Sequence, residues 1–268
     1  MGKQRIEEVF QDKLAAGQKL FVPYIMAGDG GLDILEERLL FLEECGASAV
    51  ELGIPFSDPV ADGPTIQDAG IRALRNGTTL TSVFETLEGF RNKLSMPIIF
   101  MAYLNPIYKY GIEKFAADCE KAGVDGLIIP DLPLEEEALV VDYLQEKSIA
   151  LIRLAALTSP EERLREIAKR TEGFLYAVSV TGTTGARAAH QANVINYLRD
   201  LKEITDVPVL AGFGVSNPEQ GRELGSACDG VIVGSKIVEL LYQDKIDEVK
   251  RLIRESIYNT SISSSGTR

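Results

Sequence analysis

The chain has 268 residues, and its 28 basic and 40 acidic side chains give a net charge of −12. Hydrophobic residues make up 45% of it, which is typical of a globular protein with one large core. The acidic excess argues against binding to nucleic-acid phosphates. The sequence contains no run of about 18 apolar residues, the length that a membrane-spanning helix needs. The first 20 residues lack the apolar core of a secretory signal, so we expect a cytoplasmic protein.

Cysteine and histidine are too few and too scattered to build the usual metal sites. Cys45, Cys119 and Cys228 lie 74 and 109 residues apart, and an odd number of distant cysteines predicts reduced, buried thiols. His190 is the single histidine, and we expect it at the surface near a helix N-terminus. We therefore expect no metal in this chain.

Strands and helices alternate along the chain. The first segment places Ile6, Val9, Phe10 and Leu14 at helical spacing, which predicts a helix across the open bottom of a barrel. Eight short, near-continuously apolar runs follow, as expected for parallel strands covered on both faces. These predicted strands are 20–26, 48–54, 97–103, 125–130, 149–155, 174–180, 207–213 and 229–234.

The segments between these strands read as helices. The predicted helices include 32–45, 112–122, 135–147 and 160–170. Pro160 suits the first turn of its helix behind Thr158 or Ser159 as a cap. Pro218 suits the same position behind Asn217. Three joints between helix and strand, CGASAVELG, AGVDGLIIP and LGSACDGVIVG, each offer a glycine suited to a left-handed helix end.

The repeated unit predicts a single-domain (β/α)8 TIM barrel with an extra N-terminal helix. The alternative is a doubly wound open sheet, which usually has fewer strands, and no G-x-G-x-x-G motif follows the first strand. We expect the barrel to occupy residues 1–258. The polar, serine-rich residues 259–268 are expected to fray.

A carboxylate inside the second predicted strand is the clearest sign of chemistry. Glu51 lies in the apolar run SAVELGI, and a buried carboxylate is costly unless it is hydrogen-bonded or neutralised. One reading is a structural glutamate paired with Arg153 from a neighbouring strand. The other is a carboxyl group whose pKa is raised by burial, suited to moving a proton in both directions.

The loop after this strand, IPFSDPVADGPTIQDA, adds two more acids at the same end of the barrel. Asp58 or Asp62 alone could simply cap a helix that begins near Pro64. Together with Glu51 they predict a carboxylate cluster at the barrel mouth, because barrel active sites lie at the carboxyl ends of the strands.

Glycine-rich loops after the last three strands predict a phosphate site. They are TGTTGAR (181–187), GFGVSNPE (212–219) and GSKI (234–237). Loops after strands seven and eight commonly hold a phosphate, and the first loop could close over the ligand. A plain turn is the alternative for each glycine alone. None of the first seven strands ends in a lysine for a Schiff base, and Lys236 follows a helix start. The residues thus predict carboxylate acid–base chemistry on a small phosphorylated substrate.

ELGIPFSDPVADGPTIQDA (51–69) resembles the signature of the tryptophan synthase α subunit family. Further matches occur in the same order: PYIMAGD (23–29), YLNPI (103–107), IIPDLP (128–133), VSVTGTTGAR (178–187), GFGVSNPEQ (212–220) and VGSKIV (233–238). The resemblance implies cleavage of indole-3-glycerol phosphate to indole and glyceraldehyde 3-phosphate, with Glu51 and Asp62 as the catalytic residues. Glu51 would protonate indole C3 and deprotonate the glycerol hydroxyl, while Asp62 would hold the ring N–H.

The resemblance also implies binding residues by their position. The indole pocket would be lined by Tyr24, Tyr103, Ile128, Leu154 and Tyr176. The phosphate would be surrounded by Thr184, Gly185, Phe213, Gly214, Gly234 and Ser235. Thr184 would also orient Asp62. Barrel core is the alternative reading of the aromatic and aliphatic set. Two departures are Tyr24, where the family often has Phe, and the looser match at 155–162.

The family works as an α2β2 complex with a PLP-dependent β subunit that receives indole through a tunnel. The resemblance therefore implies no cofactor in this chain, PLP in the partner, and a partner-facing surface at Asp58, Pro59 and Asp131. Three other readings stay open. They are a free-standing lyase of the same family, a non-catalytic subunit that only activates the β partner, and a different phosphosugar barrel such as an isomerase or epimerase.

Overall fold

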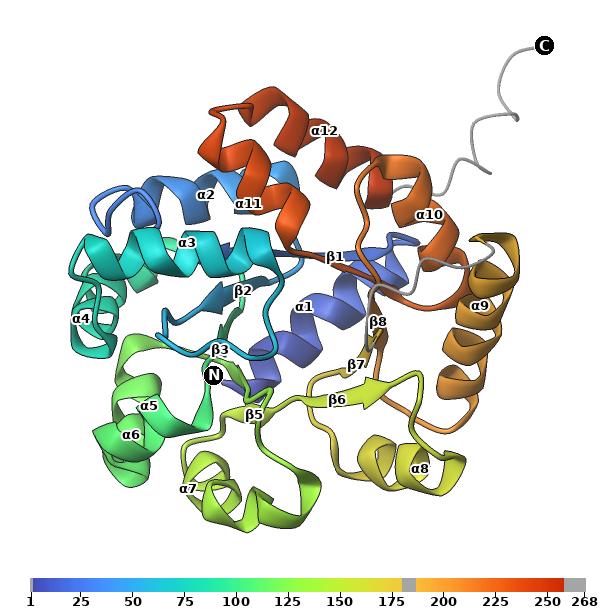
Figure 1. Ribbon diagram of the computed structural model, residues 1–268, viewed down its shortest axis with the longest axis horizontal. Helices are drawn as coiled ribbons and strands as arrows, with labels where there is room; N and C mark the ends of the chain where they lie inside the picture. Colours follow the sequence, from blue (N-terminus) through green and yellow to red (C-terminus); the bar gives the residue numbers. More distant parts are fainter. Residues whose placement is uncertain (1, 180–186, 258–268) are drawn as a thin grey trace.

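The computed structural model describes residues 2–179 and 187–257, and its strands form a (β/α)8 barrel surrounded by helices (Figure 1). The strand pairs are all parallel, in the order β5-β4-β3-β2-β1-β9-β8-β7-β6. The strands are β1 (Leu20–Met26), β2 (Val50–Gly53), β3 (Ile98–Met101), β4 (Gly126–Ile128), β5 (Ala150–Leu151), β6 (Arg153–Ala156), β7 (Leu175–Val178), β8 (Val209–Gly212) and β9 (Gly230–Val233).

The barrel closes through one interrupted strand. β5 pairs with β4 and β6 pairs with β7, with Ile152 between them. The Ile152 N–H still donates to the Leu127 carbonyl at 3.0 Å, so the chain keeps its direction through the break. All eight predicted strands are confirmed, and the fifth is divided into β5 and β6.

Helices cover the outer face of the barrel (Figure 1). They are α1 (Lys3–Ala15), α2 (Leu35–Cys45), α3 (Pro64–Arg75), α4 (Leu80–Phe90), η1 (Arg91–Lys93), α5 (Leu104–Tyr110), α6 (Ile112–Ala122), η2 (Leu134–Leu139), α7 (Val141–Glu146), α8 (Glu161–Arg170), α9 (Arg187–Glu203), α10 (Pro218–Ala227), α11 (Ser235–Tyr242) and α12 (Ile246–Ile257). The helices predicted at 32–45 and 112–122 are confirmed as α2 and α6. His190 lies in α9.

Two helix predictions need correction. The helix expected over 135–147 divides into η2 and α7, because Val140 lies between them at φ −123°, outside the helical range. Pro160 itself occupies the N-cap position of α8 in an extended conformation, so neither Thr158 nor Ser159 caps the helix. The Asn217 prediction is confirmed, because its side chain accepts the Gln220 N–H at the start of α10.

Two of the three similar joints end as predicted. Gly46 and Gly123 end α2 and α6 in the left-handed conformation, at φ 100° and 72°. In the third joint α10 continues through Gly225 to Ala227, and Cys228 ends it in an extended conformation. That joint therefore resembles the others in sequence only.

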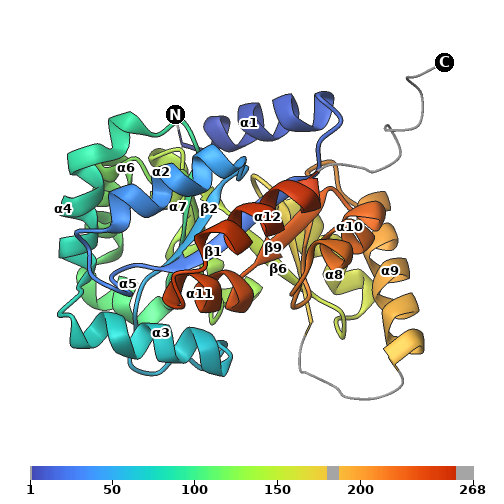
Figure 2. The same cartoon turned by 90° about the horizontal axis from the view of Figure 1, so that it is seen from above.

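The N-terminal helix closes the bottom of the barrel, as predicted (Figure 2). Ile6 and Phe10 of α1 are buried, and Val9 and Leu14 pack against the same cluster. That cluster is the inner core of the barrel, formed by Leu20, Val22, Ala49, Ile99, Ile128, Ala150, Ile152, Phe174, Leu210 and Ile232. The carboxyl ends of the strands remain as the end at which a ligand can enter.

Three further sequence predictions concern the cysteines, membrane-spanning helices and the C-terminal tail. The three cysteines are buried and free, as predicted. Within residues 2–179 and 187–257, no helix is long and apolar enough to cross a bilayer. The predicted tail at 259–268 lies outside the described residues, so that domain boundary stays a prediction.

Four side-chain hydrogen bonds, here called the bottom clips, fasten alternate strand pairs at the end of the barrel near α1. In each clip, a side chain one to three residues before a strand accepts the backbone N–H of the first or second residue of the preceding strand, with β5 and β6 taken as one interrupted strand. The clips join Phe21 N to Ser48 Oγ (3.1 Å), Ile98 N to Asp125 Oδ2 (3.0 Å), Leu151 N to Glu172 Oε2 (3.1 Å) and Val209 N to Asp229 Oδ2 (2.7 Å).

The Asp125 clip is expected to contribute the most stability. The Asp125 carboxylate is buried and also accepts hydrogen bonds from Arg5 and Arg91, each at 2.9 Å. Asp125→Ala leaves the Arg91 guanidinium, which is only 10% exposed, without its charge partner. We expect the free energy of unfolding to fall by about 3–5 kcal/mol, measured as a lower urea midpoint at constant slope.

Asp229→Ala serves as the matched control. It removes the same kind of clip, but its cation Lys202 is 40% exposed and can be solvated by water. The midpoint should therefore fall less. Equal losses in the two variants would contradict the view that buried charge pairing, rather than the clip alone, sets the cost.

Candidate active site

Glu51 is held inside the barrel by strand alternation. Its neighbours in β2, Val50 and Leu52, face the outer core, so Glu51 faces the barrel interior. Its side chain is buried, and Oε2 has no hydrogen-bond partner among the described atoms. Burial, as the larger cause, and the nearby Asp62 charge together raise the pKa of Glu51 to about 8. Glu51 therefore carries a proton at neutral pH.

The structural reading of Glu51 is wrong. Arg153, the basic residue considered as its partner, instead pairs with Glu137 at 2.7 Å and hydrogen-bonds the backbone of Arg170. The alternation of the strand explains this, because Leu154 faces the barrel interior and its neighbour Arg153 faces outward. A buried carboxyl with no basic partner is expected to be functional.

Asp62 is held in the same cavity as Glu51 by the loop that follows β2. The Asp62 N–H donates to the Pro59 carbonyl at 3.1 Å, and the Gln67 side chain donates to the Asp62 carbonyl at 2.9 Å. Burial raises the pKa of Asp62 to about 6, although a hydrogen bond from Tyr103 opposes the increase. The two acids therefore differ in protonation near pH 7.

The helix-cap alternative for the aspartates is also wrong. Gly63 occupies the N-cap position of α3, and no side chain caps that helix. Its first residue, Pro64, needs no N–H partner. Neither Asp58 nor Asp62 therefore caps α3, which was the structural role considered for them.

A cavity of about 830 Å³ gathers most of the predicted residues at the carboxyl ends of the strands. Glu51 and Asp62 lie on its wall. The other predicted residues that line it are Tyr24, Ile128, Leu154, Tyr176, Gly214, Gly234 and Ser235. The cavity therefore combines an apolar region, the two predicted acids, a third acid at Glu239, and residues of the glycine-rich loops that follow β8 and β9.

Two predicted ligand-binding residues, Tyr103 and Phe213, do not line this cavity. Tyr103 is buried behind it, where its hydroxyl accepts the Ala61 N–H at 3.0 Å. Phe213 is half-buried, with its ring 6.3 Å from that of Tyr197. Thr184 and Gly185 lie outside the described residues. Their predicted contacts with the phosphate stay predictions.

Two tyrosines of the cavity wall are each accommodated by a glycine of the neighbouring strand. Tyr24 of β1 lies over Gly53 of β2, where an added Cβ would come 2.0 Å from the tyrosine oxygen. Tyr176 of β7 lies over Gly212 of β8, where an added Cβ would come 2.4 Å from the ring. Glycine on the neighbouring strand thus makes room for each ring. Both rings help to exclude water from Glu51.

The Tyr103 hydroxyl is expected to tune Asp62. Its hydrogen bond favours the ionised carboxylate, so Tyr103→Phe should raise the pKa of Asp62. The measurement is a carboxyl titration of selectively labelled protein by NMR. Tyr108→Phe is the control, because Tyr108 is exposed and does not line the cavity. A lower pKa in the Tyr103 variant would contradict this account.

The predicted partner-facing residues are near the surface. Asp58 is exposed and accepts the Ser57 hydroxyl at 2.6 Å, while Pro59 is half-buried. Asp131 is exposed and accepts the Leu104 N–H at the start of α5. Asp131 therefore has a local structural role that the sequence did not indicate. The adjoining Val60 is an exposed apolar side chain on the same loop, at 83% exposure.

Sequence reasoning did not assign a ligand-binding role to four polar residues of the cavity wall. They are Ser179, Ser216, Lys236 and Glu239. Lys236 was noted within the predicted phosphate loop 234–237 and as a residue after a helix start, but not as a binding residue. Its position in the first turn after the last strand was the available signal, because that turn faces the barrel mouth.

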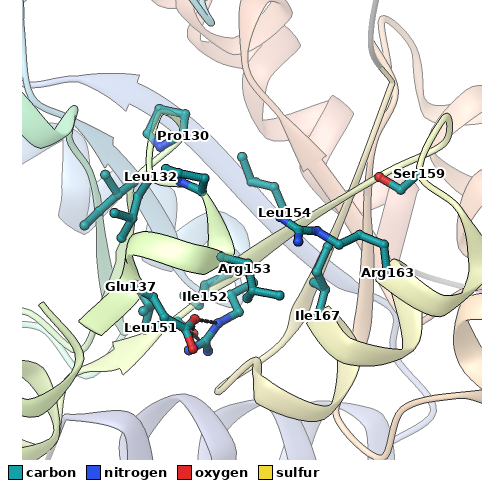
Figure 3. A pocket seen from close by; sticks show the side chains of 13 residues that line it. Pro130, Leu132, Glu137, Leu151, Ile152, Arg153, Leu154, Ser159, Arg163 and Ile167 are labelled. Carbon is teal, nitrogen blue, oxygen red and sulfur yellow. Dashed lines mark hydrogen bonds and ion pairs between the residues drawn. The ribbon is translucent and has the colours of Figure 1, made fainter. Parts of the chain in front are cut away.

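A second cavity of about 230 Å³ lies outside the barrel between η2 and α8 (Figure 3). It shares Pro130 and Leu154 with the larger cavity. Its charged side chains are already paired, Arg153 with Glu137 and Arg163 with Glu135. The groups with shifted pKa values suited to proton transfer therefore lie in the larger cavity. Among the described residues, no cluster of three His, Cys, Asp or Glu side chains could hold a metal ion.

Comparison with known proteins agrees with this geometry. A family profile described as "Tryptophan synthase alpha chain" matches residues 10–265. The tryptophan synthase alpha chain of Oceanobacillus iheyensis is 61% identical over 257 residues, covering 96% of this chain and 98% of that one. A crystal structure of tryptophan synthase subunit alpha from Legionella pneumophila is 33% identical, with a TM-score of 0.85 over 96% of this chain and 97% of that one. A chain from the tryptophan synthase a2b2 complex of Pyrococcus furiosus is 40% identical, with a TM-score of 0.79 over 89% and 96%.

Proposed function

The chain belongs to the tryptophan synthase alpha chain family, and from this we propose that it cleaves indole-3-glycerol phosphate to indole and glyceraldehyde 3-phosphate. The observation that carries the proposal is the buried, unpartnered Glu51 carboxyl in one cavity with Asp62. The two groups have different pKa values near neutral pH. That difference lets one act as an acid while the other is a carboxylate.

Glu51 carries both proton transfers. Its carboxyl gives a proton to indole C3, which leaves positive charge at the ring nitrogen. The Glu51 carboxylate then takes the proton of the glycerol hydroxyl. As that carbonyl forms, the bond between C3 and the glycerol carbon breaks, and its electron pair returns to the indole ring. Glu51 ends the cycle protonated, so no proton is gained or lost.

Asp62 stabilises the charge that forms between these steps. Its carboxylate accepts the ring N–H as the nitrogen becomes positive, an interaction stronger in the transition state than in the substrate. Tyr103 keeps Asp62 ionised and oriented through its hydroxyl. The acids alone supply this chemistry, so we propose that the chain needs no cofactor of its own.

The substrate fits the two halves of the cavity. The indole would contact Tyr24, Ile128, Leu154 and Tyr176, whose apolar surfaces exclude water. The phosphate would lie against Gly214, Gly234 and Ser235, beside the N-terminus of α11. Phe213, Thr184 and Gly185 are proposed as further phosphate neighbours on the resemblance alone.

We also propose a tryptophan synthase β subunit as the partner, in an α2β2 assembly with PLP in that subunit. The related Pyrococcus complex and the exposed loop bearing Asp58, Pro59 and Val60 support this. Asp131 would extend the same surface. The cytoplasmic location stays a prediction from the sequence.

The test is turnover of indole-3-glycerol phosphate by the purified chain, with and without a cognate β subunit. The α-subunit function predicts slow cleavage alone and a large rise with the partner. Fast cleavage without a partner would identify a free-standing lyase. Activation of the β subunit with no cleavage in either condition would identify a non-catalytic activating subunit. Failure to bind an indole phosphate would favour a different phosphosugar barrel.

A further inference from the structure

One cation on the wall of the large cavity has no role in the chemistry above. Lys236 is the second residue of α11, directly after Gly234 and Ser235, and it lines the cavity. Among the described lining residues it is the only lysine or arginine. Glu51, Asp62 and Glu239 are acids on the same wall.

This charge distribution is unfavourable for a phosphorylated substrate. The chain as a whole carries −12, and two ionisable carboxyl groups besides the protonated Glu51, those of Asp62 and Glu239, line the cavity that a phosphate dianion must enter. Backbone N–H groups at a helix start favour an anion. The Lys236 ammonium on the same cavity wall adds a full positive charge that would attract the dianion.

Lys236 forms a weak ion pair with Glu239 in the structure. Its Nζ lies 3.2 Å from Oε2 of Glu239, three residues further along the helix, and the Lys236 and Glu239 side chains are 28% and 46% exposed. A partly exposed pair at this spacing contributes little to helix stability. Because both residues line the cavity, the pair lies where an incoming anion can compete with the Glu239 carboxylate.

We propose that Lys236 binds the substrate phosphate, exchanging its contact with Glu239 for a contact with a phosphate oxygen. The proposal rests on the function proposed above and adds a binding residue to it. In the empty site Glu239 holds the ammonium near the cavity. In the occupied site the phosphate replaces Glu239, and the charge-assisted hydrogen bond strengthens binding without taking part in the proton transfers.

The test compares four variants in complex with the β subunit: Lys236→Met, Lys236→Arg, Glu239→Gln and Lys245→Met. Lys245 is the matched control, because it forms the same kind of pair with Glu248, at 3.5 Å, and does not line the cavity. Lys236→Met should raise KM about tenfold with little change in kcat. Lys236→Arg should restore most of the affinity. Glu239→Gln should lower KM, and Lys245→Met should leave it unchanged.

The binding of inorganic phosphate tests the role of Lys236 independently of the proposed cleavage activity. Its dissociation constant is measured by calorimetric titration of the unreacted protein, so the result does not depend on turnover. Lys236→Met should weaken phosphate binding about tenfold and reduce its dependence on salt concentration. Unchanged phosphate affinity and KM in Lys236→Met would overturn the proposal even if the chain cleaves its substrate. A lower kcat at unchanged KM would also overturn it.

Discussion

Replacing Glu51 with Gln should lower kcat for indole-3-glycerol phosphate cleavage by about 10²–10⁴-fold, the contribution of one general acid–base group. The amide keeps the shape of the side chain but can neither give the proton to C3 nor take it from the hydroxyl. Steady-state release of indole in the presence of the β subunit measures the loss. KM should change little, because the mutation removes an interaction made in the transition state.

The stability of the same variant provides the control. The pKa of Glu51 is raised from 4.5 to about 8 in the folded chain, so the folded state retains a proton that the unfolded state has released. The stability of the unaltered chain should therefore decrease as pH rises from about 4.5 to 8. Glu51→Gln lacks this loss and should be the more stable protein at pH 8, as measured by urea unfolding. An inactive variant that is less stable at that pH would point to misfolding instead.

Replacing Asp62 with Asn should lower kcat/KM by about 10²-fold or more and should also change the pH profile. The unaltered enzyme needs Asp62 ionised and Glu51 protonated. Activity should therefore fall below about pH 6 as Asp62 gains a proton, and above about pH 8 as Glu51 loses one. The amide cannot titrate, so the acidic limb should disappear and the basic limb should remain.

The basic limb should also move in this variant. The Asp62 charge is one cause of the raised pKa of Glu51, so its removal should shift the basic limb to lower pH. The two apparent pKa values belong to the coupled pair, and both limbs must be measured. Retention of the acidic limb in Asp62→Asn would show that another group controls it.

Local patterns were sufficient to predict most of the architecture. The helix 112–122 and the strand 20–26 appear as predicted, because each has a clear apolar pattern and the helix has a defined end at Gly123. The division of 135–147 could not be predicted. Glu137 is drawn to Arg153 and Arg170 by ion pairs that exist only in the folded chain, and tertiary contacts of this kind override helix propensity.

The candidate site was also predicted only in part, because some of its features follow from local sequence and others from tertiary contacts. The alternation of β2 directs Glu51 inward, and this follows from sequence alone. That its carboxyl oxygen has no partner depends on where Arg153 points, which requires the folded structure. The hydrogen bond from Tyr103 to Asp62 joins residues from different loops. Lys236 lies in the predicted phosphate loop 234–237, but that its side chain lines the cavity beside Glu239 is known only from the folded structure.

The placement of the bottom clips bears on how such a barrel could have arisen. Each clip lies within a pair of consecutive strands in the barrel, and the described residues show no equivalent clip between one pair and the next. The barrel can thus be viewed as four similar modules, each with its own fastening. Duplication of one ancestral module would produce this spacing without inventing a new contact each time. It would also leave the opposite rim of every copy free to diverge, so that Glu51 could be acquired in one module while the others kept only their structural fastening.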